Sequence, residues 1–378
     1  MHGREEERGQ LKRKLLAGVS INMPAPRRIG KTWTINRLAG DLKKDGWVAI
    51  EVDVEGVDTQ EEFSKRLCKA VEAQLSRQDR FKSHLSQRFQ NLIGGDWSGS
   101  AIDALGKMDA IEFLEVLISS LNESEEKSAI LIDEIAYFFL KCAERDQEEA
   151  YKFAYSLRRI QQGSRNVRWV LTGSIGLNIV AKRYGLAGAF VDFETFMLQP
   201  FTKREARSFL RDPIVQSQIN HIFDSTDEDF DKMFDELGWL APYYLKLVAN
   251  ETKPLEFDQD RQIAVATFED FSEAFDRLLQ PGRDTEFCVW RGHIEKNLAS
   301  TDQGLAFKML DLLSKDRDGE AMDTILAMAP MAEMETGRKQ VKQILAILLN
   351  DGLLRLTDGR YQFQSGLVRR YWKEYEAE

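Results

Sequence analysis

The residues best suited to chemistry lie in a short run that ends in glycine, lysine and threonine. The run Ala25-Pro-Arg-Arg-Ile-Gly-Lys-Thr32 follows an apolar segment, residues 18–23, and precedes residues 35–42, where apolar side chains recur with a helical period. A strand, a loop and a helix in this order direct backbone N–H groups and the helix dipole at one anion. Lys31 could then reach the β- and γ-phosphates of a nucleotide, and the Thr32 hydroxyl could bind Mg²⁺.

The loop departs from the pattern G-x-x-x-x-G-K-[ST] at its first position, where Ala25 replaces glycine. If the backbone there needs a positive φ, alanine costs on the order of 1 kcal/mol, and otherwise its methyl group narrows the approach to the phosphates. We expect the nucleotide to be bound by this loop, the start of the helix and a proline of a later segment. These residues are Ala25, Pro26, Arg27, Arg28, Ile29, Gly30, Lys31, Thr32, Thr34 and Pro242.

Two acidic residues follow a second apolar run. Residues 128–132 read Ser-Ala-Ile-Leu-Ile, and Asp133 and Glu134 come next. Such a run is typical of a strand buried on both faces, and open α/β sheets bind ligands beyond the carboxyl ends of their strands. We therefore expect Asp133 to hold Mg²⁺ together with Thr32, and Glu134 to orient or deprotonate the attacking water.

A third strand is expected at residues 167–174, between the two strands already described. Thr172 or Ser174 at its end could hydrogen-bond the γ-phosphate or the attacking water, and the alternative is a strand that simply ends in a turn. We take Ser174 as the residue that senses the terminal phosphate. The predicted catalytic residues are then Lys31, Asp133, Glu134 and Ser174.

Efficient phosphoryl transfer also calls for a cationic finger, which is worth roughly 10³ to 10⁵ in rate. The candidates are Arg158, Arg159 and Arg183. Each of them could equally be a surface or ion-paired residue.

Several motifs occur along the chain in a characteristic order. They are Gly3-Arg-Glu5, Pro26-Arg-Arg-Ile-Gly-Lys-Thr32, Leu131-Ile-Asp-Glu134, Thr172-Gly-Ser174, Leu198-Gln-Pro-Phe-Thr202 and Leu237-Gly-Trp-Leu-Ala-Pro242. In this order they resemble the archaeal-type ATPase family of prokaryotes, in the STAND and AAA+-like branch of P-loop NTPases. The resemblance covers roughly the whole chain, and it departs from the family at Ala25 and at Leu237-Gly-Trp, which has one glycine where relatives often have two.

The resemblance implies an α/β fold: a P-loop NTPase with a parallel five-stranded sheet of order 5-1-4-3-2, a helical lid and a C-terminal winged helix. We expect an ATPase core over residues 1–200, a helical lid and connector over 201–300, and a winged-helix domain over 301–378. Pro242 would begin a lid helix close to the nucleotide. Residues 76–100 read as an insertion or surface excursion, in which Trp97 is either a partner contact or a residue packed on the domain surface.

The winged helix is also expected from the residues themselves. Residues 301–350 contain three stretches with helical periodicity, and residues 354–363 alternate around a turn at Asp358-Gly359. Cations on the third helix and the wing could meet DNA phosphates. They are Arg338, Lys339, Lys342 and Arg360.

Charge argues against a nucleic-acid footprint over the whole surface, since the net charge of the chain is −10. Residues 301–378 hold eleven Lys and Arg against thirteen Asp and Glu, so any DNA contact is confined to one face. A winged helix that contacts a protein, or another part of its own chain, stays an alternative.

Neither a run of eighteen apolar residues nor a secretory signal occurs, which places the protein in the cytoplasm. The three cysteines and four histidines show no metal-like spacing.

These expectations combine in an ATP-binding and ATP-hydrolysing molecular switch with Mg²⁺ as its metal ion. A protein partner is expected, and DNA and a second copy of the chain are open alternatives as partners. The rival hypothesis is a non-hydrolysing nucleotide-bound scaffold or DNA-binding regulator. Ala25 favours this rival and Glu134 argues against it.

Overall fold

The computed structural model describes residues 4–74, 87–88, 90–91, 107–282, 286–287, 289–328 and 334–377. The chain forms two compact units. The first, here called the sheet unit, comprises Arg4–Ala25 and Lys31–Leu198. The second, the C-terminal unit, comprises Gln199–Glu378 and the short loop Pro26–Gly30. Of the predicted insertion at residues 76–100, the described residues include only 87–88 and 90–91, and Trp97 lies outside them.

A five-stranded parallel sheet forms the centre of the sheet unit, in the order β2-β3-β4-β1-β5. This is the predicted order, which is thereby confirmed. The strands are β1 (Ser20–Pro24), β2 (Val48–Asp53), β3 (Ser128–Asp133), β4 (Val167–Gly173) and β5 (Phe193–Thr195). No residue range was predicted for β5, because this edge strand is only three residues long and its side chains are exposed or half-buried.

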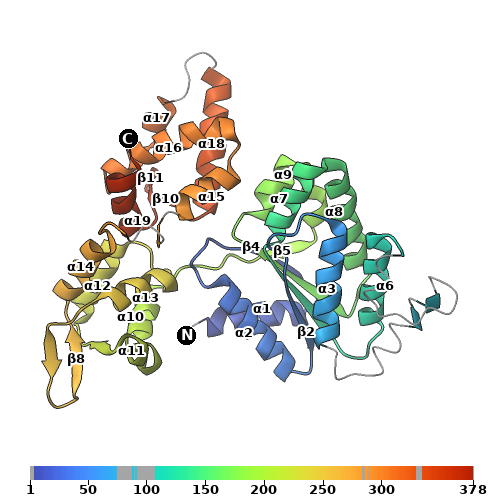
Figure 1. Ribbon diagram of the computed structural model, residues 1–378, viewed down its shortest axis with the longest axis horizontal. Helices are drawn as coiled ribbons and strands as arrows, with labels where there is room; N and C mark the ends of the chain where they lie inside the picture. Colours follow the sequence, from blue (N-terminus) through green and yellow to red (C-terminus); the bar gives the residue numbers. More distant parts are fainter. Residues whose placement is uncertain are drawn as a thin grey trace. The chain divides into compact units, whose positions relative to one another are not determined.

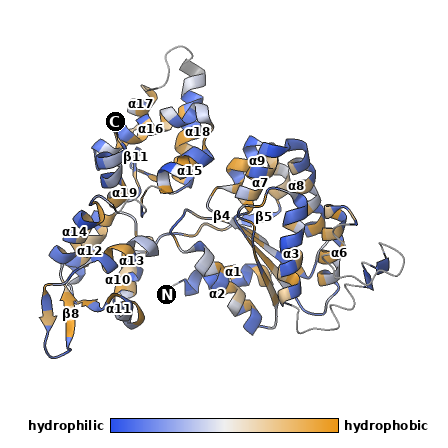
Figure 2. Cartoon of the chain, in the orientation of Figure 1, coloured by the Kyte–Doolittle hydropathy of each residue, from blue (hydrophilic) through white to orange (hydrophobic). Residues whose placement is uncertain are grey.

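Helices cover both faces of this sheet (Figure 1). One face carries α1 (Glu5–Leu16) and α2 (Lys31–Lys44). The other carries α3, α6, α7, α8 and α9, whose buried side chains join those of β2, β3 and β4 in one hydrophobic cluster. Their bounds are Gln60–Gln74, Ala110–Asn122, Ile135–Arg145, Gln147–Gln162 and Leu177–Arg183, and a short 3₁₀ helix spans Ala187–Phe190. Figure 2 shows hydrophobic strands between helices whose outer faces are hydrophilic.

The sequence explains the start of several of these helices. Asp109 and Asp146 cap α6 and α8, since their carboxylates accept backbone N–H groups of the first turn. The helix α7 begins directly after β3, with Glu134 between them. All five strands run in parallel, so Pro24, Asp133 and Gly173 end β1, β3 and β4 at the same edge of the sheet.

The first part of the C-terminal unit is mainly helical. Its helices are α10 (Lys203–Leu210), α11 (Pro213–Ile219), α12 (Asp227–Leu237), α13 (Pro242–Glu251) and α14 (Phe268–Leu278). A small sheet of order β6-β8-β7 was not predicted. Its strands, His221–Phe223, Ile263–Ala266 and Glu256–Asp258, are too short to show a period in the sequence.

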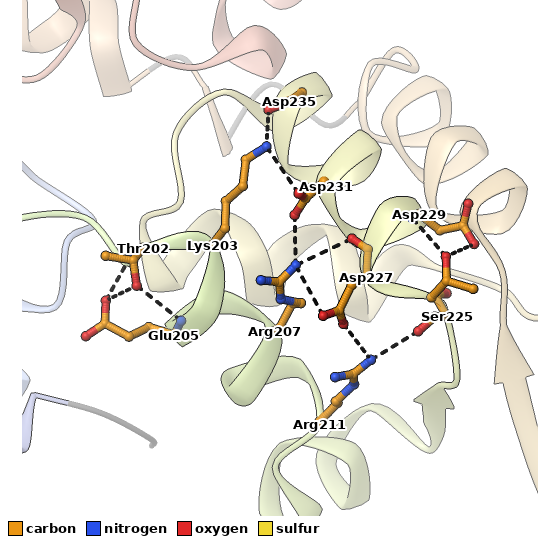
Figure 3. Close-up of polar contacts among 11 residues, drawn as sticks. Thr202, Lys203, Glu205, Arg207, Arg211, Ser225, Asp227, Asp229, Asp231 and Asp235 are labelled. Carbon is orange, nitrogen blue, oxygen red and sulfur yellow. Dashed lines mark hydrogen bonds and ion pairs between the residues drawn. The ribbon is translucent and has the colours of Figure 1, made fainter.

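A ladder of ion pairs joins α10 to α12 (Figure 3). Cations spaced four residues apart on one segment face aspartates spaced four apart on the other. The pairs are Lys203–Asp235 at 2.8 Å, Lys203–Asp231 at 3.8 Å, Arg207–Asp231 at 3.0 Å, Arg207–Asp227 at 3.8 Å and Arg211–Asp227 at 3.3 Å. Two further caps flank the ladder, since Thr202 and Glu205 form a capping box on α10 and Thr226 caps α12.

The last part of the unit contains the elements expected of a winged helix. Helices α15 (Val289–Asn297), α16 (Ser300–Lys315), α17 (Met322–Leu326) and α18 (Met334–Asn350) precede the hairpin of β10 (Leu354–Thr357) and β11 (Arg360–Phe363). The two-residue strand β9 (Glu320–Ala321), which was not predicted, pairs with β11. A closing helix α19 (Gly366–Tyr371) and a π-helical turn (Trp372–Glu376) were also missed. Among the described residues, none of these helices has both the length and the hydropathy that a membrane span requires.

Candidate active site

Lys31 lies between the two acidic residues that end β3. It is the first residue of α2, its side chain is only 8% exposed, and its Nζ lies 2.6 Å from Glu134 Oε1 and 3.3 Å from Asp133 Oδ1. The two runs singled out in the sequence, about a hundred residues apart, are therefore in direct contact within the sheet unit. A cation so placed can offset the charge of a phosphate group, provided that it leaves one of its carboxylates.

Thr32 and Asp133 are suited to share one metal ion. The Thr32 hydroxyl donates a hydrogen bond of 2.9 Å to Asp133 Oδ2. Mg²⁺ holds oxygen ligands octahedrally at about 2.0–2.1 Å, so two neighbouring ligands are about 2.9 Å apart. The observed separation of these two oxygens thus fits the Mg²⁺ ion that the sequence predicts between them. Protein sites for Mg²⁺ commonly supply only one or two ligands and leave the rest to phosphate and water.

Glu134 is held at both carboxylate oxygens. Oε1 accepts from Lys31, while Oε2 accepts from the backbone N–H and from the hydroxyl of Ser174, each at 3.0 Å. Burial raises the pKa of the Glu134 carboxyl, but the Lys31 charge and the hydrogen bonds from Lys31 and Ser174 outweigh it and hold the pKa below its usual value. Glu134 is therefore an ionised acceptor. It can accept a proton from water only after one of these partners moves.

The backbone of Glu134 is strained as well. Its φ is 57°, in the left-handed region that side-chain-bearing residues seldom adopt. This conformation directs the end of β3 into α7 and brings the carboxylate against Ser174, which follows β4. Strain of this kind costs of order 1–3 kcal/mol and is found mainly at functional sites.

The loop before Lys31 resolves the question raised by Ala25. Within it the positive φ values belong to Arg28, at 73°, and Gly30, at 91°, whereas Ala25 is not among the described residues with a positive φ. Alanine therefore carries no left-handed strain at this position. Its N–H group donates to Gly173 O at 3.4 Å, which continues the pairing of β1 with β4.

Ile29, Thr34 and Pro242 were also predicted around the nucleotide. Ile29 and Thr34 are 1% and 0% exposed, so neither side chain offers much surface to a ligand. Pro242 begins α13 in the C-terminal unit, and its Cγ lies 3.9 Å from the position of a Cβ built on Gly30 of the loop. Pro242 therefore lies near the loop, and its contact with nucleotide stays a prediction.

The three arginines considered as fingers contact their own neighbours. Arg158 donates to Asp192 Oδ2 at 2.6 Å and to Gly188 O at 2.8 Å, and Arg159 pairs with Glu115. Arg183, near the end of α9, is exposed and lies 5.3 Å from the centre of the Tyr184 ring. Their role in catalysis stays a prediction.

The cations predicted to meet DNA also differ from one another. Arg338, Lys339 and Lys342 are exposed on α18. Arg360, by contrast, is engaged, because it donates to the carbonyl oxygens of Asp318 at 3.1 Å and Gly319 at 2.5 Å. The three cations of α18 are therefore more available to DNA phosphates than Arg360 is.

Sequence reasoning missed the partners of the loop and the contact between Lys31 and Glu134. Neither leaves a signal in residue type or spacing. In the part of the chain that the structure describes, no cluster of three or more His, Cys, Asp or Glu side chains could hold a metal ion. The expected pair of Thr32 and Asp133 would not form such a cluster, since threonine is one of its members.

Comparison with known proteins supports this interpretation of the fold. Residues 23–179 match the family model described as an AAA domain. The structure is similar to that of a Walker-type ATPase of Pyrococcus abyssi, with a TM-score of 0.64 and 17% identity over 98% of this chain and 95% of that chain. It is also similar to the ORC2 protein of Aeropyrum pernix solved in ADPNP–ADP complexes, with a TM-score of 0.54 and 13% identity over 99% of this chain and 93% of that one. A search of curated proteins found no significant match.

Proposed function

We propose that this chain is an ATP-binding and ATP-hydrolysing molecular switch, whose nucleotide state is coupled to a protein partner or to DNA through its C-terminal elements. One observation carries the proposal: Lys31, Thr32, Asp133 and Glu134 meet at the carboxyl end of β3. The AAA match over residues 23–179 supports it, because the match includes all four residues.

Each group has a distinct task in this proposal. Backbone N–H groups of the loop and the Lys31 ammonium bind the phosphates, and Thr32 and Asp133 would hold Mg²⁺. The ion, when bound, neutralises charge on the β- and γ-phosphate oxygens. Ser174, whose hydroxyl is 3.0 Å from Glu134 Oε2, senses the terminal phosphate.

Hydrolysis requires the carboxylate of Glu134 to be released first. Phosphate oxygens compete for the Lys31 ammonium, which leaves Glu134 Oε1 available to a water molecule. That water attacks the γ-phosphorus as the bond to the ADP oxygen breaks, and its proton passes to Glu134. The products are ADP and inorganic phosphate.

Phosphate release by the purified full chain, measured with ATP and Mg²⁺, tests the proposal. Glu134→Gln keeps the shape of the side chain but removes the proton acceptor, so we expect a loss of at least about 10²-fold in rate. Glu125→Gln is the matched control, since Glu125 is exposed and lies just before β3. Equal rates for wild type and Glu134→Gln would reject hydrolysis at this site and favour the non-hydrolysing scaffold, provided that calorimetry still detects nucleotide binding.

A further inference from the structure

The loop Pro26–Gly30 packs among residues that lie far away in the sequence, inside the C-terminal unit. Its residues Pro26, Arg27 and Arg28 each interact with a different part of that unit. The same loop leads directly into Lys31, where the phosphates are expected to bind. Its backbone conformation therefore matters for the site.

Gly352 makes the closest of these approaches. It follows α18, its φ is 75°, and a Cβ built on it would lie 2.5 Å from Pro26 Cβ and 2.8 Å from Pro26 Cγ. Real Cβ atoms are never that close to another carbon, and the proline ring has no rotamer that would let it move aside. Trp239 Cη2 lies 3.4 Å from the same Cβ position. Only glycine therefore fits at residue 352 while the loop keeps its place.

Asp351, the residue before Gly352, is buried within reach of the Arg27 charge. Its carboxylate is 6% exposed and accepts a hydrogen bond of 2.6 Å from Asn297. Burial raises the pKa of Asp351 to about 7, although the hydrogen bonds from Asn297 and Asn350 and the charge of Arg27 oppose the rise. Among the described residues, Asp351 Oδ1 and Arg27 Nε are both buried without a hydrogen-bond partner. Both atoms are therefore desolvated without a compensating hydrogen bond.

Arg28 is held by an aromatic ring. Its guanidinium carbon lies 3.7 Å from the centre of the Tyr243 ring, within the range of a cation–π interaction. Tyr243 is the second residue of α13, directly after Pro242. Because Arg28 has a φ of 73°, this contact fixes a backbone conformation that the residue would not adopt by preference.

We propose that Gly352 and Tyr243 are positioning residues for nucleotide binding: they hold the loop before Lys31 in the conformation that receives phosphate. This inference rests on the proposed ATP binding, and it names residues of the C-terminal unit that affect nucleotide affinity. The segment between α18 and β10 is thereby linked to the nucleotide. The coupling is reciprocal. A ligand or partner that changes the conformation of this segment changes nucleotide affinity, and bound nucleotide stabilises one conformation of the segment.

A pair of glycine substitutions tests the inference. Gly352→Ala and Gly359→Ala both place a side chain at nearly the same positive φ, 75° and 76°, so both carry similar backbone strain. A Cβ on Gly359, in the turn of the β10–β11 hairpin, meets no atom of the described residues within 4 Å. Only Gly352→Ala forces the loop to move. We expect it to raise the dissociation constant for a non-hydrolysable ATP analogue with Mg²⁺ at least about tenfold, and Gly359→Ala to leave it near that of wild type.

A second measurement uses the wild-type chain alone and does not depend on whether a variant folds. The amides of Asp351, Gly352 and Leu353 hydrogen-bond to carbonyls of the last turns of α18, at 2.9–3.1 Å. We expect saturating ATP analogue to slow their hydrogen exchange, since a merely structural contact would not respond to nucleotide.

The outcomes separate the inference from the proposed function. Equal affinities in the two glycine variants, or unchanged exchange at residues 351–353 in a wild type that binds nucleotide, would overturn the inference and leave ATP binding intact. A wild-type chain that binds no nucleotide would instead contradict the proposed function, and the inference with it.

Discussion

Lys31 Nζ lies 2.6 Å from Glu134 Oε1, so the cation expected to bind phosphate and the carboxylate expected to receive a proton neutralise each other in the structure. Both side chains are largely buried, which strengthens their interaction. Nucleotide must therefore displace Glu134 before it gains the full charge of Lys31. Binding and catalysis make opposite demands on this pair.

The first prediction follows from this competition. Glu134→Gln removes the negative charge that holds Lys31, so nucleotide affinity is expected to rise by about tenfold while hydrolysis falls. Titration calorimetry with an ATP analogue and Mg²⁺ measures the affinity, with Glu125→Gln as the control. Weaker binding by Glu134→Gln than by the control would show that the ion pair does not oppose nucleotide.

The second prediction concerns pH and Asp351. Its folded pKa, about 7, is raised from an ordinary value near 3.8, so the folded state binds the proton more tightly than the unfolded state does. The contribution of Asp351 to the free energy of unfolding is therefore largest below about pH 4, and it is lost as the pH rises to about 7. Three pKa units correspond to a loss of about 4 kcal/mol in the free energy of unfolding.

Asp351→Asn should remove this loss and keep the contact with Asn297. Urea denaturation of both proteins at pH 5 and pH 8 measures it, and the exposed Asp323→Asn on α17 is the control. The stability difference between the two pH values should shrink in Asp351→Asn alone. A difference that stays as large as in wild type would contradict the raised pKa.

The third prediction concerns DNA. If the exposed cations of α18 meet phosphates, binding to duplex DNA falls steeply with salt, and Arg338→Ala with Lys342→Ala lowers the slope of log K against log salt by about 1.8. Lys65→Ala with Lys69→Ala is the matched control, because these lysines are also exposed and four residues apart, on α3. Fluorescence anisotropy over a salt series measures the slope. Binding that does not depend on salt, or that both double variants weaken equally, would exclude α18 as the contact.

The fourth prediction concerns the ladder of Figure 3. Asp231 is its central aspartate and pairs with both Lys203 and Arg207. Asp231→Asn should cost about 0.5–1 kcal/mol in the free energy of unfolding, because the pairs are partly exposed, and the cost should shrink in high salt. Glu228→Gln, which removes only a pair with Lys232, serves as the control in the same urea titrations. A larger loss, unaffected by salt, would mean that packing and not charge dominates.

Long apolar runs and motif order were sufficient to predict the central sheet. Residues 128–132 and 167–171 form strands buried on both faces, and such strands appear as continuous apolar runs in a sequence. Strands of two or three residues, such as β5 and β9, have no detectable period, so their positions could not be predicted.

The candidate site was predictable only in part, for a related reason. Lys31, Thr32 and Asp133 lie in local patterns with a known physical basis, so their types and spacing mark them as candidates. The contacts of Pro26 with Gly352 and of Arg28 with Tyr243 join segments more than 200 residues apart in the sequence. Only tertiary packing brings these segments together, and a single sequence does not record it.

The ladder between α10 and α12 also constrains how the two helices can align. Cations at 203, 207 and 211 meet aspartates at 235, 231 and 227, so the charges repeat at every turn of both helices. A slip of one turn would leave a lysine or arginine at one end and an aspartate at the other without a counter-ion. The three ion pairs therefore disfavour misaligned packings of the two helices during folding, although each pair contributes little to stability.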